Sequence, residues 1–179
     1  YFVNELGLTR QMPAVKWTMQ LMPLVAVGGS LGSGIISDKV FKGHRSPVAM
    51  VLYFMITVVI IIAVIMIEGF GMRGVFLSCL FLILISLAVN ATHSIVGAAA
   101  PMDIGGRKMA GFAAGVIDSF QYFGAGIAVP LMGKLLDKYG WVTWFPTMAV
   151  FGFLGGCAML LVMRKQRRLK EQGHKHAND

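Results

Sequence analysis

The chain has 179 residues, of which 56% are hydrophobic and 13% are charged, and its mean hydropathy is +0.72. Because soluble domains are about 25% charged, this composition excludes a disordered chain, a collagen-like chain and a disulfide scaffold, and it disfavours a soluble enzyme. The formal net charge of +8 would suit nucleic acid, but the positions of the charges favour a membrane instead.

Five stretches of 21 to 29 residues carry no charged side chain, except for one carboxylate in the fourth. A helix rises 1.5 Å per residue, so about 20 residues cross the roughly 30 Å core of a bilayer. The sequence therefore predicts an all-α, multi-pass transmembrane helix bundle with five complete spans. Residues 1–12 are expected to end a preceding helix and form an outside loop, and residues 164–179 to form a basic tail. The membrane domain, 13–163, is expected to hold spans at approximately 14–37, 46–67, 74–101, 107–135 and 142–163.

The first span ends in small residues spaced four apart, Gly28/Gly32 and Ser30/Gly34. This spacing predicts close helix packing in lipid. A short basic loop follows, and its residues form a candidate conformational-switch motif. Asp38 lies at the membrane rim, where its carboxylate can accept hydrogen bonds from Arg45 or from a helix N-terminus. The motif consists of Gly34, Asp38, Lys39, Gly43 and Arg45.

The second span is nearly featureless and is expected to be an outer, lipid-facing helix. Polar residues return in the third and fourth spans at steps of three and four, which place them on one face of each helix. Pro101 is expected to close the third span and Pro130 to bend the fourth. The polar faces comprise Ser86, Asn90, His93 and Gly97 in the third span, and Gly111, Gly115, Asp118, Gln121 and Tyr122 in the fourth.

Asp118 is the charged residue inside a span. A charge at the bilayer centre costs roughly 2.5–3.5 kcal/mol on insertion scales, so it persists where it faces a cavity or a partner. The sequence therefore predicts a substrate-binding cavity lined by Asn90, His93, Asp118, Gln121 and Tyr122. Two structural alternatives stay open: a hydrogen bond between Asp118 and Asn90, and a purely structural His93. Ser86 and Ser94 are interpreted as packing residues.

The fifth span contains Gly152-x-x-x-Gly156 and leads into the basic tail. If the spans alternate, the side that holds the tail carries 11 Lys and Arg and the other side carries 5. This asymmetry predicts a cytoplasmic C-terminus by the positive-inside rule. The net charge is thus an orientation signal, and we expect no nucleic acid partner.

The sequence shows no nucleophile–base pair, phosphate-binding loop or metal cluster, so we expect no enzyme activity, no cofactor and no metal. Cys79 and Cys157 lie in apolar runs and are interpreted as plain thiols.

The stretch from Gly28 to Arg45 resembles the loop between the eighth and ninth helices of major facilitator superfamily transporters. Within it, Ser37-Asp38-Lys39-Val40-Phe41-x-Gly43-x-Arg45 is similar to the organophosphate:phosphate antiporter family, which includes glycerol-3-phosphate and hexose-phosphate antiporters and a hexose-phosphate sensor. The stretch from Gly105 to Gly115 resembles the connection between the tenth and eleventh helices. The resemblance covers essentially the whole chain, as the C-terminal half of the fold without most of the seventh helix.

The resemblance implies twelve helices in two halves, a substrate at midplane, and a phosphate held by arginines of the first and seventh helices, outside this chain. It places Tyr122 where family members carry a cavity-facing tyrosine, and Ala91 where they often carry an aromatic. We therefore expect a secondary transporter of a phosphorylated organic solute, in exchange for inorganic phosphate, by alternating access in a bacterial inner membrane. Its expected partners are the solute, phosphate, the lipid bilayer and the missing N-terminal half of the same protein. The alternatives are a membrane-bound sugar-phosphate sensor that signals to a partner protein, and a scaffold without a site, which Asp118 disfavours.

Overall fold

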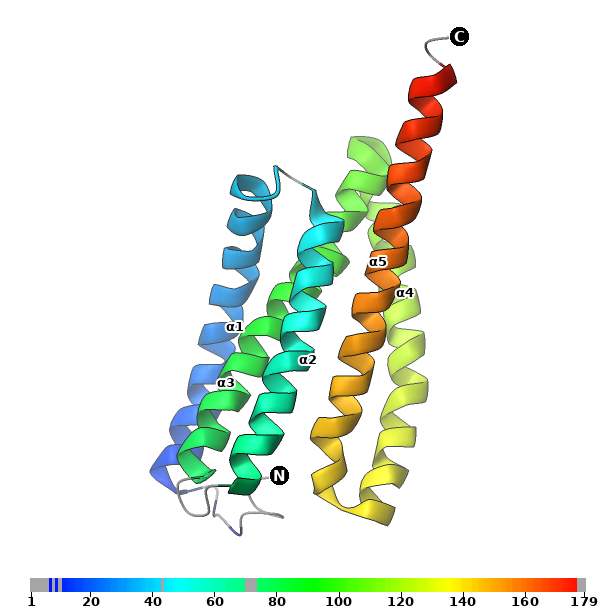
Figure 1. Cartoon of the computed structure of the whole chain (residues 1–179). Coiled ribbons are helices and arrows are strands. Elements are labelled where there is room, and N and C mark those ends of the chain that lie inside the picture. The colour runs from blue at the N-terminus through cyan, green and yellow to red at the C-terminus, as the bar shows by residue number, and fades with distance from the viewer. Residues whose placement is uncertain (1–6, 8, 10, 43, 70–73, 177–179) are drawn as a thin grey trace.

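The computed structural model describes residues 7, 9, 11–42, 44–69 and 74–176, and within these residues every regular element is a helix (Figure 1). Side chains at 67–69, 74, 103–105, 107, 142 and 169–176 are not described. The elements are α1 (Pro13–Lys39), α2 (Arg45–Gly69), α3 (Gly74–His93), the π-helix η2 (Ser94–Ala99), α4 (Ala100–Tyr139), the 3-10 turn η3 (Trp141–Thr143) and α5 (Trp144–His176).

In the part of the chain that the structure describes, five helical segments are long and apolar enough to cross a membrane, which confirms the prediction of an all-α bundle with five spans. In a bilayer, a helix satisfies all of its backbone hydrogen bonds within one segment. This explains why even the Val- and Ile-rich α2 is helical. The residues expected before the first span lie mostly outside the described residues. The segments are Pro13–Lys39, Arg45–Met66, Val75–Met102, Lys108–Tyr139 and Trp144–Arg168.

The helices pack unevenly around α2 and α3. Helix α3 packs against α1 and α2, and α2 also packs against α5, whereas α4 contacts the rest of the bundle chiefly through η2 and η3 (Figure 1). The main apolar core lies between α2, α3 and the start of α5, and includes Ile60, Ala88 and Phe145. The prediction that the second span is a lipid-facing outer helix therefore needs correction. One side of α2 is exposed at Val58 and Ile65, but the opposite side supplies this core.

Small and polar residues join α1 to α3. A Cβ on Gly29 would run into the backbone carbonyl oxygen of Leu87, so the helices lie closest at this glycine. Ser86 donates a hydrogen bond to the backbone oxygen of Met22 at 3.3 Å, and Ser94 donates to that of Ser30 at 3.5 Å. Both serines act as packing residues, as predicted.

The expected pairing of Gly28 with Gly32 is not the basis of this contact. A Cβ on either glycine, or on Gly34, would meet no atom within 4 Å. Ser30, by contrast, does face α3, and its hydroxyl donates to the backbone oxygen of Asn90 at 3.3 Å. The side of α1 that packs on α3 is thus rotated by one residue from the Gly28/Gly32 side.

Glycines of α5 lie against α2. A Cβ on Gly152 would lie 2.8 Å from the Thr57 hydroxyl oxygen, and one on Gly156 would lie 2.8 Å from the Phe54 ring. A Cβ on Gly155 would lie 2.7 Å from the ring of Tyr53. These three glycines allow α5 to approach α2 closely.

The chain reverses after the third span at Gly106, whose φ of 58° and ψ of −171° break the helical backbone inside α4. Glycine adopts this conformation without the steric penalty that a Cβ would bring. The third membrane-spanning segment ends at Met102, next to Pro101 as expected, although the helical backbone continues through the proline. The non-helical backbone inside α4 lies at Gly106.

Candidate functional site

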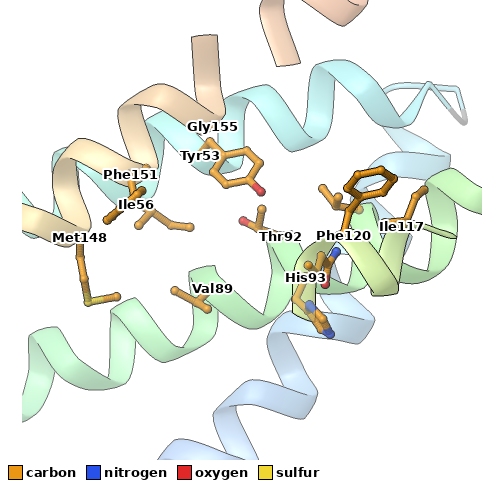
Figure 2. A pocket seen from close by; sticks show the side chains of 13 residues that line it. Tyr53, Ile56, Val89, Thr92, His93, Ile117, Phe120, Met148, Phe151 and Gly155 are labelled. Atoms are coloured by element: carbon orange, nitrogen blue, oxygen red, sulfur yellow. The ribbon is translucent and has the colours of Figure 1, made fainter. Parts of the chain in front are cut away.

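A cavity of about 760 Å³ lies between α2, α3, η2, α4 and α5 (Figure 2). Helix α4 contacts the rest of the bundle mainly through η2 and η3, which leaves space between α4 and the helices α2, α3 and α5. Most of its lining is apolar. The lining residues are Tyr53, Ile56, Val89, Thr92, His93, Val96, Ile117, Phe120, Gln121, Met148, Phe151, Gly152 and Gly155.

Two polar residues of this lining, Tyr53 and Thr92, were missed by the sequence analysis. Figure 2 shows the hydroxyl of Tyr53 on the side of the ring that points toward Thr92. The Thr92 hydroxyl is buried and donates to the backbone oxygen of Ala88 at 2.9 Å, which leaves its lone pairs as acceptors. The signal for Tyr53 was its phenol within an otherwise apolar span, and the signal for Thr92 was its position next to His93.

Three of the five predicted site residues converge on one point, the backbone of Gly97. A Cβ built on Gly97 would lie 3.6 Å from His93 Cε1, 3.7 Å from Gln121 Nε2 and 3.8 Å from Asp118 Oδ1. His93 comes from the end of α3, and the other two come from successive turns of α4. The π-helix contains Gly97 and connects these helices. We call His93, Asp118 and Gln121 the polar cluster.

The polar cluster lies at an edge of the cavity, because His93 and Gln121 also line it. Asp118 and Gln121 are half-buried and His93 is exposed. This arrangement brings together a carboxylate acceptor, an amide that donates and accepts, and an imidazole. Chemically, such a set can hold the hydroxyl groups of a solute or exchange a proton.

Asn90 and Tyr122 are not brought into this cluster. The side-chain amide of Asn90 donates to the backbone oxygen of Ser86 at 2.8 Å, within its own helix. In the described part of the chain, no hydrogen bond joins Asn90 to Asp118, so that structural alternative is not formed. Tyr122 follows Gln121 directly on α4, and its side chain is 78% exposed.

The candidate switch motif lies at the C-terminal end of α1 and at the start of α2. Gly34, Asp38 and Lys39 belong to the last turns of α1, where Asp38 and Lys39 are exposed. Arg45 is the first residue of α2. Gly43 lies outside the described residues. In the connection between α1 and α2, Lys42 has a left-handed backbone conformation, with a φ of 51°.

Curated proteins similar to this chain are transporters and sensors of bacterial membranes. The glycerol-3-phosphate transporter of Bacillus subtilis is 29% identical over 70% of the chain and 28% of its own length. A probable hexose phosphate transport protein of Chlamydia pneumoniae is 30% identical over 76% of the chain and 30% of its own length. Membrane sensor protein UhpC of Escherichia coli is 27% identical over 77% of the chain and 30% of its own length.

The chain thus spans about a third of the length of these relatives. No protein-family model and no solved structure matches it. The chain resembles the organophosphate:phosphate antiporter family of the major facilitator superfamily, as its loop motifs predicted.

Proposed function

We propose, from its resemblance to organophosphate:phosphate antiporters, that this chain is part of a secondary transporter that exchanges a phosphorylated organic solute for inorganic phosphate by alternating access. The observation that carries the proposal is the polar cluster at the edge of a cavity between membrane-spanning helices. A carboxylate inside a span is retained where water, a ligand or a partner group receives it. A hydroxylated solute would satisfy this carboxylate and the neighbouring amide.

The names of the relatives support a phosphorylated solute, because they include glycerol-3-phosphate and hexose phosphate transporters. None of the relatives described above is named as an enzyme. Transport is proposed over sensing because four of the matching relatives are named as transporters and two as sensors. Under this proposal Asn90 and Tyr122 complete the cavity lining when the rest of the protein encloses it.

The proposed topology is a five-span membrane domain at 13–163 followed by a basic cytoplasmic tail at 164–179, in a bacterial inner membrane. The support comes from the distribution of charge over the two ends of the bundle. One end carries Lys39, Lys42 and the exposed Arg164, Lys165, Arg167 and Arg168 of α5, which extends beyond the other helices (Figure 1). Positive loops and tails stay in the cytoplasm.

The proposed role of the motif from Gly34 to Arg45 is a conformational switch. Asp38 stands at the rim, on the connection between two spans that must move as the transporter rocks. A carboxylate there can form an ion pair or helix-terminus contact in one state and lose it in the other.

The test is solute exchange by the full-length protein that carries this chain, reconstituted in liposomes. Labelled glucose-6-phosphate and labelled glycerol-3-phosphate are added outside vesicles that contain inorganic phosphate, and outside matched vesicles that contain sulfate. We expect uptake of at least one solute that depends on internal phosphate, and no uptake of glucose or glycerol. Solute binding without uptake would contradict transport and indicate a sensor. Uptake that ignores internal phosphate would contradict exchange.

A further inference from the structure

We infer that the outer side of α5 binds an anionic phospholipid, whose acyl chains lie along apolar residues and whose phosphate lies against two arginines at their end. The apolar residues are Val150, Leu154 and Leu161, and the arginines are Arg164 and Arg168. We call these five residues the lipid stripe. They lie outside the cavity and the polar cluster, so the inference does not depend on the solute.

Contacts with α2 show which way each side of α5 faces. A Cβ on Gly155 would lie 2.7 Å from a ring of α2. Eleven residues further along α5, the Ser46 hydroxyl at the start of α2 donates to the side-chain oxygen of Gln166 at 3.1 Å. Arg164 and Arg168 each lie two residues from Gln166, which is a rotation of about 200° around a helix. The two arginines, both exposed, therefore point away from α2.

The apolar residues of the lipid stripe lie on the same side of α5 as the arginines. Steps of four, seven, three and four connect the five residues, and such steps keep side chains on one side of a helix. Val150, Leu154 and Leu161 are 58%, 55% and 64% exposed. The outer side of α5 thus changes from apolar to cationic within one turn, between Leu161 and Arg164.

The residue types on the two sides of α5 indicate that the outer side meets lipid rather than another helix. Helices that pack together in membranes do so through small residues. The side of α5 that packs on α2 has this character, because it presents Gly152, Gly155 and Gly156. The lipid stripe has large branched side chains instead, and acyl chains are as apolar as leucine.

The two arginines complement an anionic headgroup. Residues 144–168 contain no Asp or Glu, so α5 itself supplies no carboxylate to neutralise them there. A guanidinium group binds phosphate with two parallel hydrogen bonds. Helix α5 extends beyond the other helices at this end (Figure 1), which places the arginines where the apolar span gives way to headgroups. A zwitterionic lipid carries an additional ammonium group, which the arginines repel, so the stripe favours a lipid with net negative charge.

The experiment measures which lipid lies against the stripe. The full-length protein is reconstituted in phosphatidylcholine liposomes that contain a photoactivatable phosphatidylglycerol, or a phosphatidylcholine with the same group on its acyl chain. After irradiation, labelled residues are located by peptide mass spectrometry. We expect the phosphatidylglycerol probe to label the stripe about tenfold more than the phosphatidylcholine probe, because each cation near the headgroups strengthens the attraction of anionic lipid roughly fivefold.

Variants assign this preference to the two arginines. Arg164→Gln with Arg168→Gln should reduce phosphatidylglycerol labelling of the stripe to the level of phosphatidylcholine. The matched control, Lys134→Gln with Lys138→Gln, removes the same charge from exposed positions at the other end of the bundle and should change nothing. Arg164→Lys with Arg168→Lys keeps the charge and should keep a preference for phosphatidylglycerol, which separates lost binding from failed insertion.

Four outcomes would overturn the inference. Equal labelling by the two probes would show only the lipid that surrounds any membrane protein. A stripe that neither probe labels, while Ile65 on the exposed side of α2 is labelled, would show that protein covers it. An equal loss of labelling in the control variant would reduce the effect to net charge. Displacement of the phosphatidylglycerol probe by inorganic phosphate, but not by sodium chloride of the same ionic strength, would indicate a site for a free anion.

Discussion

Gly29→Ala should destabilise the bundle by separating α1 from α3. A Cβ at this position would run into the backbone oxygen of Leu87 and would lie 3.2 Å from the carbonyl carbon. Backbone atoms cannot swing aside as a side chain can, so α1 would have to withdraw by roughly 1 Å to restore an ordinary contact.

The cost of this withdrawal has two parts. Overpacking of a tight contact typically costs about 1–3 kcal/mol. The bonds from Ser86 to Met22 and from Ser30 to Asn90 are already 3.3 Å long, so the same movement would stretch them beyond hydrogen-bond length. Interhelical hydrogen bonds in membranes average about 0.6 kcal/mol each. The expected loss in the free energy of unfolding is therefore about 2–4 kcal/mol.

The assay is unfolding of the purified full-length protein in mixed detergent micelles, followed by tryptophan fluorescence. The controls are Gly28→Ala and Gly32→Ala, because a Cβ at either position would meet no atom within 4 Å. Both should be neutral or stabilising by up to about 1 kcal/mol, since alanine is the better helix former. Equal stability of Gly29→Ala and Gly28→Ala would refute the reasoning.

Two further substitutions test the site and the rim. Asp118→Asn keeps the volume and the hydrogen-bonding capacity but removes the charge, so it should reduce solute exchange at equal protein level while membrane insertion stays intact; wild-type rates at every external pH would leave Asp118 with a structural role only. Asp38→Asn should slow exchange with near-normal expression, because its carboxylate is exposed at the end of α1 and is proposed to act in switching; unchanged exchange would reduce this loop to an orientation signal.

The helices themselves could be predicted from the sequence because the signal is physical and local. A run of apolar residues long enough to cross a bilayer has to be helical there, and charges mark where it leaves the lipid. The contact between α2 and α5 was not predicted. Gly152 and Gly156 are four residues apart and both face α2, but such spacing does not identify the helix that is met.

The side of each helix that packs against its neighbours, and the points where the backbone breaks, were harder to predict. On α1 the glycines and serines are so dense that spacing alone cannot select the packed side, and Gly29 rather than Gly28 faces α3. The backbone break at Gly106 was not predicted, because the positive φ that glycine allows cannot be recognised from residue spacing. The apolar character of α2 suggested an outer, lipid-facing helix, but one side of α2 supplies the core. Composition does not separate the two, because lipid and a protein core are equally apolar surroundings.

The candidate site was predicted in part. Helical spacing alone brought out His93, Asp118 and Gln121, which the structure gathers around Gly97. Asn90 shares the expected face, but its amide has a nearer acceptor one turn back, in Ser86. The π-helix was not predictable from spacing, because it departs from the 3.6-residue period on which that reasoning rests.

Access of a water-soluble reagent to position 121 tests the central claim most directly. The variant is Gln121→Cys in a full-length protein with Cys79→Ser and Cys157→Ser, and its control is Ile65→Cys on the exposed outer side of α2. Each is treated with a charged methanethiosulfonate reagent, with and without glucose-6-phosphate or glycerol-3-phosphate. We predict that position 121 reacts, that at least one phosphorylated solute slows the reaction, that glucose and glycerol do not, and that position 65 is unreactive. Lack of reaction at position 121, or reaction at a rate that no phosphorylated solute changes, would contradict a polar cluster that lines the path of a phosphorylated solute.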